Sequence, residues 1–158
     1  MHYSVMYGRL QSEIKQSKPF ASLAHEAILG LLRTAAVVDH ATEEALRPFG
    51  VTGTQFNVLR ILRGAGPNGL CGREVGERMI TRVPDVPRLL ERLEKAGLIS
   101  RERDPNDRRH VTARITERGT ELLGEIDNVS MPIVTWFDRL TQDQLRTLID
   151  ALDTVRAT

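Results

Sequence analysis

Two short helical patterns lie next to each other in residues 71–97, with a break of only a few residues between them. The first, CGREVGERM, places Val75 and Met79 four residues apart. The second, PDVPRLLERLEKAGL, directs apolar residues to one side and basic residues to the other before Gly97 ends it. Two short helices joined this tightly form a helix-turn-helix pattern. In the second helix the apolar positions are Val86, Leu89, Leu90 and Leu93, and the basic positions are Arg88, Arg92 and Lys95.

A β-hairpin is predicted directly after these helices. LISRER (98–103) and HVTARI (110–115) have the composition of strands, and DPND (104–107) supplies aspartate and proline for the turn. Helix, helix and hairpin in this order define a winged helix-turn-helix. The expected fold class is mainly α with a small β-hairpin wing, together with a helical dimerisation region.

Four arginines surround the turn of this hairpin, at Arg101, Arg103, Arg108 and Arg109. In a winged module the second helix enters the DNA major groove, and the hairpin reaches the backbone or the minor groove, where negative potential attracts arginine. The alternative is a solvated hairpin in which arginines pair with Asp104 or Asp107, each pair contributing under ~1 kcal/mol. The two preceding helices favour the first interpretation.

The distribution of charge agrees with a polyanionic partner. The whole chain has a net charge of only +1, but residues 67–116 hold 11 Lys and Arg against 8 Asp and Glu. The rest of the chain holds 11 against 13, so the positive excess lies in the middle. Such asymmetry is weak evidence for nucleic-acid binding.

Helices are predicted on both sides of this unit. The segment 22–49 shows helical spacing over about 25 residues, closed by Pro48 and Gly50. Thr52 and Gln55 form a capping box that opens the next helix. That helix ends in a glycine-rich loop, which lacks the Gly-Lys-Ser/Thr of a phosphate-binding loop.

Beyond the wing, Thr116 is the predicted N-cap of the next helix, and Pro132 bends or breaks the run that follows. Thr141 with Gln144 caps a last helix. The apolar stripe of that helix needs a partner, and with the long first helix it suits an interface between two copies of the chain. The stripe consists of Leu145, Leu148, Ile149, Leu152 and Val155.

Length and composition fit a folded protein with one domain, or one domain with appended helices. The chain has 158 residues, of which 41% are hydrophobic and 27% charged. No apolar stretch approaches the ~20 residues of a membrane span, and residues 1–20 lack a signal-peptide pattern. The only cysteine, Cys71, fits a reducing compartment, so a cytoplasmic location is expected.

The expected organisation has three parts. Residues 1–20 form an N-terminal extension, and residues 51–116 form the winged helix-turn-helix that binds DNA. Residues 21–50 together with 117–158 form the helical dimerisation region.

These motifs, in this order and spacing, resemble the MarR family of bacterial transcription regulators. The resemblance rests on FNVLRIL, GREVGERM, the exit LEKAGLI, the D-x-x-D-R-R wing and ITERG. It implies a homodimer that binds a pseudo-palindromic double-stranded operator, usually as a repressor, often released by a small aromatic or phenolic ligand. It also implies that Asp107, with Asp104, supports the wing while Arg108 or Arg109 enters the minor groove. The expected DNA-binding residues are Arg73, Arg82, Asp85, Arg88, Arg92, Arg108 and Arg109.

The start of the recognition helix departs from the family. Members often have a Ser/Thr-rich stretch there, whereas this chain has RVPDVPR. Because Pro87 would remove a backbone donor from a helix begun at Val83, we expect the helix to start near Pro84 or Asp85. Asp85 then either caps the helix or accepts a hydrogen bond from a cytosine amino group.

Two other functions compete with this interpretation. An enzyme is disfavoured because the four histidines have no Ser or Cys partner in a recognisable motif, and no Cys/His pair has zinc spacing. We therefore expect no cofactor and no metal. The second alternative is a DNA-binding regulator that senses oxidation through Cys71. The resemblance argues against it, because the sensing cysteine of the peroxide-responsive members lies near the N-terminal helix.

Overall fold

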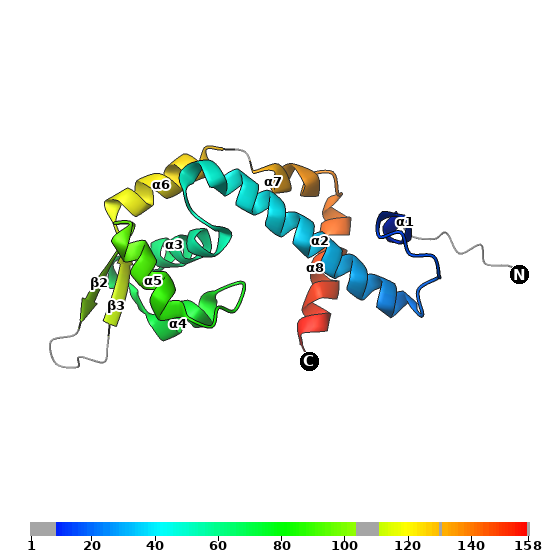
Figure 1. The fold of residues 1–158 in the computed structure, drawn as a ribbon, viewed down its shortest axis with the longest axis horizontal. Coiled ribbons are helices and arrows are strands. Elements are labelled where there is room, and N and C mark those ends of the chain that lie inside the picture. Colours follow the sequence, from blue (N-terminus) through cyan, green and yellow to red (C-terminus); the bar gives the residue numbers. More distant parts are fainter. Residues whose placement is uncertain (1–8, 104–110, 130, 158) are drawn as a thin grey trace, which may run out of the picture. The chain divides into compact units, whose positions relative to one another are not determined.

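The computed structural model describes residues 9–103, 111–129 and 131–157, which form helices and one small sheet (Figure 1). This confirms the expected mainly α fold with a small β-hairpin, while the dimerisation role of the flanking helices stays a prediction. The helices are α1 (Arg9–Glu13), α2 (Leu23–Leu46), α3 (Gly53–Ala65), α4 (Gly72–Arg78), α5 (Val86–Lys95), α6 (Glu117–Asp127), α7 (Pro132–Phe137) and α8 (Gln142–Arg156), with 3-10 turns η1 (Arg47–Phe49) and η2 (Gly66–Asn68). The strands are β1 (Leu70–Cys71), β2 (Ile99–Arg103) and β3 (Val111–Ile115).

The chain divides into two compact units, Met1–Ala41 and Thr42–Thr158, with the boundary inside α2. In the first unit, α1 lies near α2, where a Cβ on Gly30 would lie 3.8 Å from a methyl carbon of Leu10. The second unit holds the helix-turn-helix and the hairpin. The functional division expected from the sequence, with boundaries at 20, 50 and 116, stays a prediction.

The buried apolar residues of the described chain form one core within the second unit. α3 contributes Val58, Leu59 and Leu62, and α5 contributes Leu89, Leu90 and Leu93. From α6, Leu123 and Ile126 pack into the same core. The helix-turn-helix is therefore held by helices that precede and follow it. The other members are Leu46, Val51, Leu70, Val75, Met79, Leu98, Ile99 and Ala113.

The predicted hairpin is present, and a third strand joins it. β2 and β3 pair antiparallel with Ile99 opposite Ile115, and β1 adds to the other side of β3, giving the order β1-β3-β2. Gly69 leads into β1 with a φ of 65°, and a Cβ there would lie 2.4 Å from the carbonyl oxygen of Ala113. Only glycine fits such a close approach to the central strand.

The predicted helix starts are confirmed by their capping hydrogen bonds. Thr52 and Gln55 form a reciprocal capping box at α3, with the Gln55 N–H 3.2 Å from the Thr52 hydroxyl. Thr141 caps α8 in the same way, and Thr116 caps α6 by accepting from the Gly119 N–H at 3.1 Å. Pro132 breaks the run after α6, since it occupies the first turn of the separate helix α7.

Candidate nucleic-acid interface

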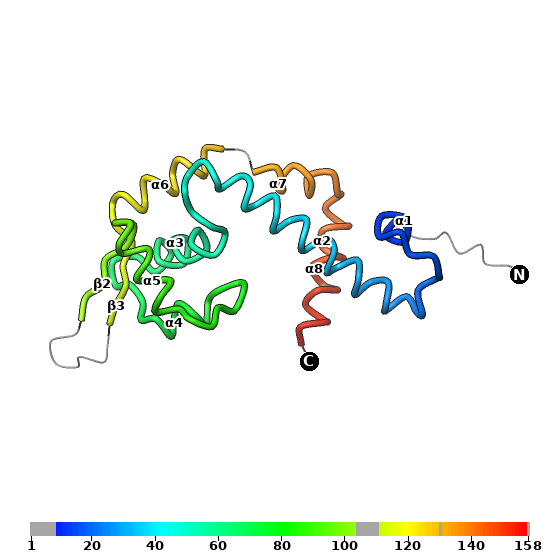
Figure 2. The backbone as a smooth tube through the Cα atoms, viewed as in Figure 1, coloured from blue at the N-terminus to red at the C-terminus, as the bar shows by residue number. Residues whose placement is uncertain are grey.

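Helices α4 and α5 form the helix-turn-helix, and Figure 2 traces the backbone from one into the other. The connection covers residues 79–85, which is longer than the break of a few residues expected from the sequence, because α5 begins only at Val86. This connection is tied to α3 where the Ile80 N–H donates to Asn57 Oδ1 at 3.0 Å. The turn is therefore held in place by the preceding helix.

Asp85 is the N-cap of α5, which confirms the first of the two roles considered for it. Its Oδ1 accepts from the Arg88 N–H at 3.0 Å, and its carbonyl oxygen accepts from the Leu89 N–H at 3.2 Å. Pro87 lies in the first turn, where a missing N–H costs little. The start expected near Pro84 or Asp85 is thus correct to within about two residues, and a contact between Asp85 and a base stays a prediction.

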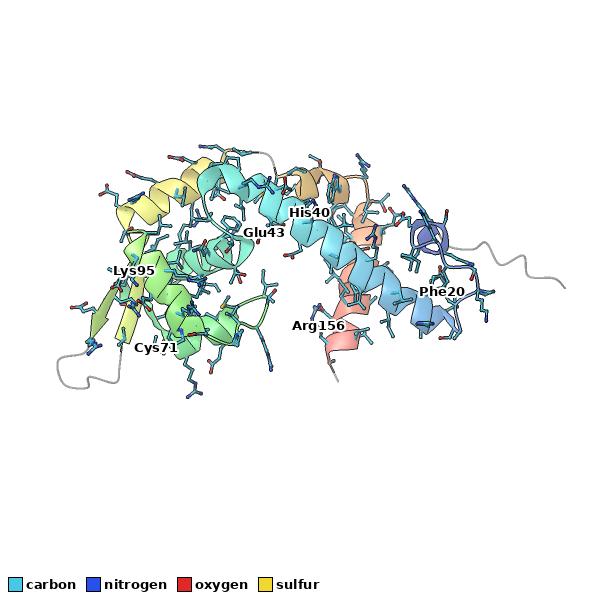
Figure 3. All side chains as sticks on the ribbon, in the orientation of Figure 1. Phe20, His40, Glu43, Cys71, Lys95 and Arg156 are labelled. Atoms are coloured by element: carbon cyan, nitrogen blue, oxygen red, sulfur yellow. The ribbon has the colours of Figure 1, made fainter. Side chains whose placement is uncertain are left out.

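The outward face of α5 is charged and exposed. Arg88 and Arg92 are exposed, while Leu89 and Leu93 on the same helix are buried. Lys95, labelled near the end of α5 in Figure 3, forms an ion pair with Glu91 at 2.6 Å. The hydrogen bond from Lys95 lowers the pKa of the Glu91 carboxyl below its usual range. This face therefore offers guanidinium groups that suit phosphates and the acceptor edges of guanine.

Arg88, Arg92 and Asp85 line one open cavity of about 360 Å³ between the start of α3 and α5. The structure thus brings three of the predicted residues together. The remaining lining comes from Thr52, Thr54, Gln55, Val83, Pro84 and Leu89.

The other two predicted contacts in the described chain lie outside this cavity. Arg73 is in the first turn of α4, where its Nε lies 2.9 Å from Glu77 Oε1 and its side chain is 86% exposed. Arg82 is exposed on the connection between the two helices. Both can reach solvent, and Arg73 shares its charge with a neighbouring carboxylate.

Two ion pairs at the base of the wing were not foreseen. Arg101 on β2 is paired with Glu94 on α5, so this arginine contacts the recognition helix, and the alternative pairing with Asp107 lies outside the described residues. Arg114 on β3 pairs with Glu102 at 2.9 Å and donates to the carbonyl oxygen of Pro67. A sequence pattern gave no signal for these pairs because their partners lie on different elements.

The predictions on the wing tip lie outside the described residues. They concern Arg108 and Arg109 as groove contacts, and Asp104 and Asp107 as supports.

Three observations on the described residues bear on the alternative functions. They contain no group of three or more His, Cys, Asp or Glu side chains that could hold a metal ion. None of the described helices is long and apolar enough to cross a membrane.

Cys71 is half-buried at the start of α4, and its N–H donates to Glu74 Oε2 at 2.8 Å. Redox sensing through Cys71 stays an untested alternative.

Comparison with known proteins identifies the chain. Residues 51–111 match the MarR family. The MarR transcription factor from Planctomyces limnophilus is 33% identical and superposes with a TM-score of 0.63, over 85% of this chain and 98% of that one.

Two other solved structures show what relatives bind. A cysteine-to-serine variant of MarR from E. coli, solved with operator DNA, is 27% identical with a TM-score of 0.68, over 85% of this chain and 99% of that one. CouR from Rhodococcus jostii RHA1, bound to p-coumaroyl-CoA, is 26% identical with a TM-score of 0.71. The match covers 85% of this chain and 94% of CouR. The protein is thus a regulator and not an enzyme. From its helix-turn-helix, its wing and these relatives, the chain belongs to the MarR family of DNA-binding transcription regulators.

Proposed function

We propose that the protein is a dimeric repressor that binds a pseudo-palindromic operator. The observation that carries this proposal is the outward face of α5, where Arg88 and Arg92 are exposed beside the helix-turn-helix connection. A helix presented in this way fits the major groove, and basic side chains on it can contact both phosphates and bases.

Apolar residues on the terminal helices support the dimer. Ile149 and Val155 on α8 are 55% and 65% exposed, and Leu23 and Leu32 on α2 are 84% and 61% exposed. A second copy of the chain would remove these apolar side chains from water. Deleting residues 141–158 should give monomers with much weaker operator binding. A truncated chain that still sediments as a full dimer would refute this part of the proposal.

The wing is proposed to add contacts through Arg108 or Arg109. An arginine in a narrow minor groove strengthens binding to the operator more than to a random duplex, while a phosphate contact strengthens both alike. We expect Arg108→Ala and Arg109→Ala to differ, one costing ~1–3 kcal/mol with lost specificity. Asp107→Ala should weaken operator binding, although it removes a negative charge. Tighter binding would show that Asp107 does not support the wing.

An effector is proposed to release the DNA, as a small aromatic or phenolic ligand. CouR binds such a compound in p-coumaroyl-CoA. In this chain the cavity lined by Arg88 and Arg92 supports the proposal, because an anionic ligand there would occupy two arginines needed for DNA. Adding p-coumarate to the protein–operator complex should release the operator, which a fall in fluorescence anisotropy measures. In the Arg92→Gln variant, p-coumarate should release less operator.

The central test is a footprint of the purified protein on its own upstream region, followed by anisotropy at several salt concentrations. Affinity should fall with a log–log slope of about −0.9 for each phosphate contact. A flat response between ~50 and ~200 mM salt would exclude this mode of binding.

A further inference from the structure

The recognition helix and the wing are joined by a side-chain contact as well as by the chain. One carboxylate oxygen, Glu94 Oε2, lies 2.8 Å from Nε and 2.6 Å from Nη2 of Arg101. The Glu94 side chain is 36% exposed and that of Arg101 is 27% exposed, so the pair is partly shielded from water. Shielding and two donors make it more specific in geometry than a solvated pair.

The pair bridges two consecutive elements, α5 and β2. α5 ends at Lys95, and Gly97, with a φ of 72°, turns the chain into β2. On β2, Arg101 lies opposite buried Ala113 and shares a sheet face with Ile99, which packs into the core. Beyond Arg103 the hairpin leaves the described residues. The Glu94–Arg101 ion pair therefore adds a polar side-chain link between α5 and the strand that leads to the wing tip, beside the apolar packing of Ile99 in the core.

A second ion pair differs in what it connects. Glu102 follows Arg101 on β2, so its side chain lies on the opposite face of the sheet, where it pairs with Arg114 of β3. That pair joins two strands of one hairpin. It holds the hairpin together but leaves its direction relative to α5 unrestrained.

We propose that Glu94 and Arg101 are positioning residues that fix the angle between the recognition helix and the wing, so that both engage one DNA duplex together. The inference rests on the DNA-binding mode proposed above. Neither residue needs to touch DNA, since the pair acts by directing the residues that do.

The proposal and simple electrostatics predict opposite changes in operator affinity when Glu94 loses its charge. Replacing Glu94 with glutamine removes a negative charge close to DNA, which by itself should tighten binding to any duplex. If the pair sets the angle, the same change should weaken binding to the operator. Overall stability should change little, because partly exposed ion pairs contribute weakly.

The first test compares Glu94→Gln with the matched control Glu102→Gln, by fluorescence anisotropy on the footprinted operator and on a random duplex of equal length. We expect Glu94→Gln to weaken operator binding about three- to tenfold while random-duplex binding stays equal or tightens. Glu102→Gln should lose no operator affinity. The proposal is overturned if Glu94→Gln binds the operator as well as the unchanged protein, or if both variants lose equally.

The second test asks whether the ion pair itself is responsible. Arg101→Gln should weaken operator binding, and adding Glu94→Gln to it should cause little further loss, because the contact is already absent. The exchange Glu94→Arg with Arg101→Glu should recover part of the operator affinity. Fully additive losses in the double glutamine variant would overturn the proposal.

A third readout does not depend on DNA. Residual dipolar couplings of backbone amides in α5 and in β2 report the angle between the two elements in solution. Glu94→Gln should change or average this angle, whereas Glu102→Gln should preserve it, with thermal unfolding confirming that both variants fold. If the angle between α5 and β2 is the same in the Glu94→Gln variant as in the protein without substitutions, the inference is overturned. If the protein without substitutions binds the operator and the random duplex equally, the proposed function alone is contradicted.

Discussion

Helices α5 and α8 both begin at a capping side chain and both carry apolar residues at helical spacing. On α5 the stripe of Leu89, Leu90 and Leu93 is buried, whereas none of the residues of α8 is buried in the structure as described. The difference shows that one sequence pattern can serve two kinds of packing. A stripe covered by its own chain builds the fold, and an uncovered stripe offers a surface for assembly.

The largest expected effect comes from the buried side of this comparison. Leu93→Ala should lower the free energy of unfolding by about 2–5 kcal/mol, because Leu93 is fully buried and its loss leaves a cavity. Leu148→Ala on α8, where the residue is 38% exposed, should cost under about 1 kcal/mol. Urea unfolding at protein concentrations that keep the chain monomeric measures both. Equal losses would mean that α8 is part of the core.

Two glycines of α6 sharpen the comparison within one helix. A Cβ at Gly119 would lie 2.2 Å from the carbonyl oxygen of Leu98, while at Gly124 no atom lies within 4 Å. Gly119→Ala should therefore destabilise by about 1–3 kcal/mol. Gly124→Ala should stabilise by about 0.5–1 kcal/mol, because alanine favours the helix. Thermal unfolding of the two variants checks the opposite signs, and a stabilising Gly119→Ala would contradict the close packing.

The N-cap residues of α6 and α8 should differ in how much they contribute to stability, with smaller effects than those of the buried residues. Thr116 caps α6 and also donates its hydroxyl to the Gly97 carbonyl oxygen at 2.8 Å, so Thr116→Ala should cost about 1 kcal/mol of global stability. Thr141→Ala should instead fray only the start of α8. Hydrogen exchange separates global from local opening. If core amides of the Thr141→Ala variant also lost protection, α8 and the core would unfold together.

The smallest effect concerns pH. The pKa of the Glu91 carboxyl is lowered by its hydrogen bond with Lys95, so this pair stabilises α5 when the pH is above the usual range for glutamate. The contribution is lost as the pH falls through the lowered pKa. An NMR titration of the Glu91 carboxyl carbon should show the low pKa, and Lys95→Met should raise that pKa toward the usual range.

Local patterns predicted much of the fold. Caps at Thr52, Thr116 and Thr141, and the two strands of the hairpin, were predicted because their signals lie within a few residues. β1 was not predicted, since Leu70 and Cys71, where the glycine-rich loop meets the predicted helix, become a strand only by pairing with β3, more than 40 residues later.

Three of the predicted site residues lie together in the structure, but their role in DNA binding stays a prediction, and the partners of the neighbouring charges were not predicted. Arg88, Arg92 and Asp85 do converge, because helical spacing places them together. The pairing of Arg101 with Glu94 depends instead on how β2 folds back along α5, which a linear pattern does not encode.

The order of the sheet also bears on aggregation. β2 is an edge strand, since β3 lies between it and β1, and a strand edge can pair with another chain. The residues nearest the wing tip on this edge are Arg101, Glu102 and Arg103, and a row of charges of this kind discourages such pairing. The hairpin can therefore remain exposed in a concentrated solution without recruiting the hairpins of neighbouring molecules.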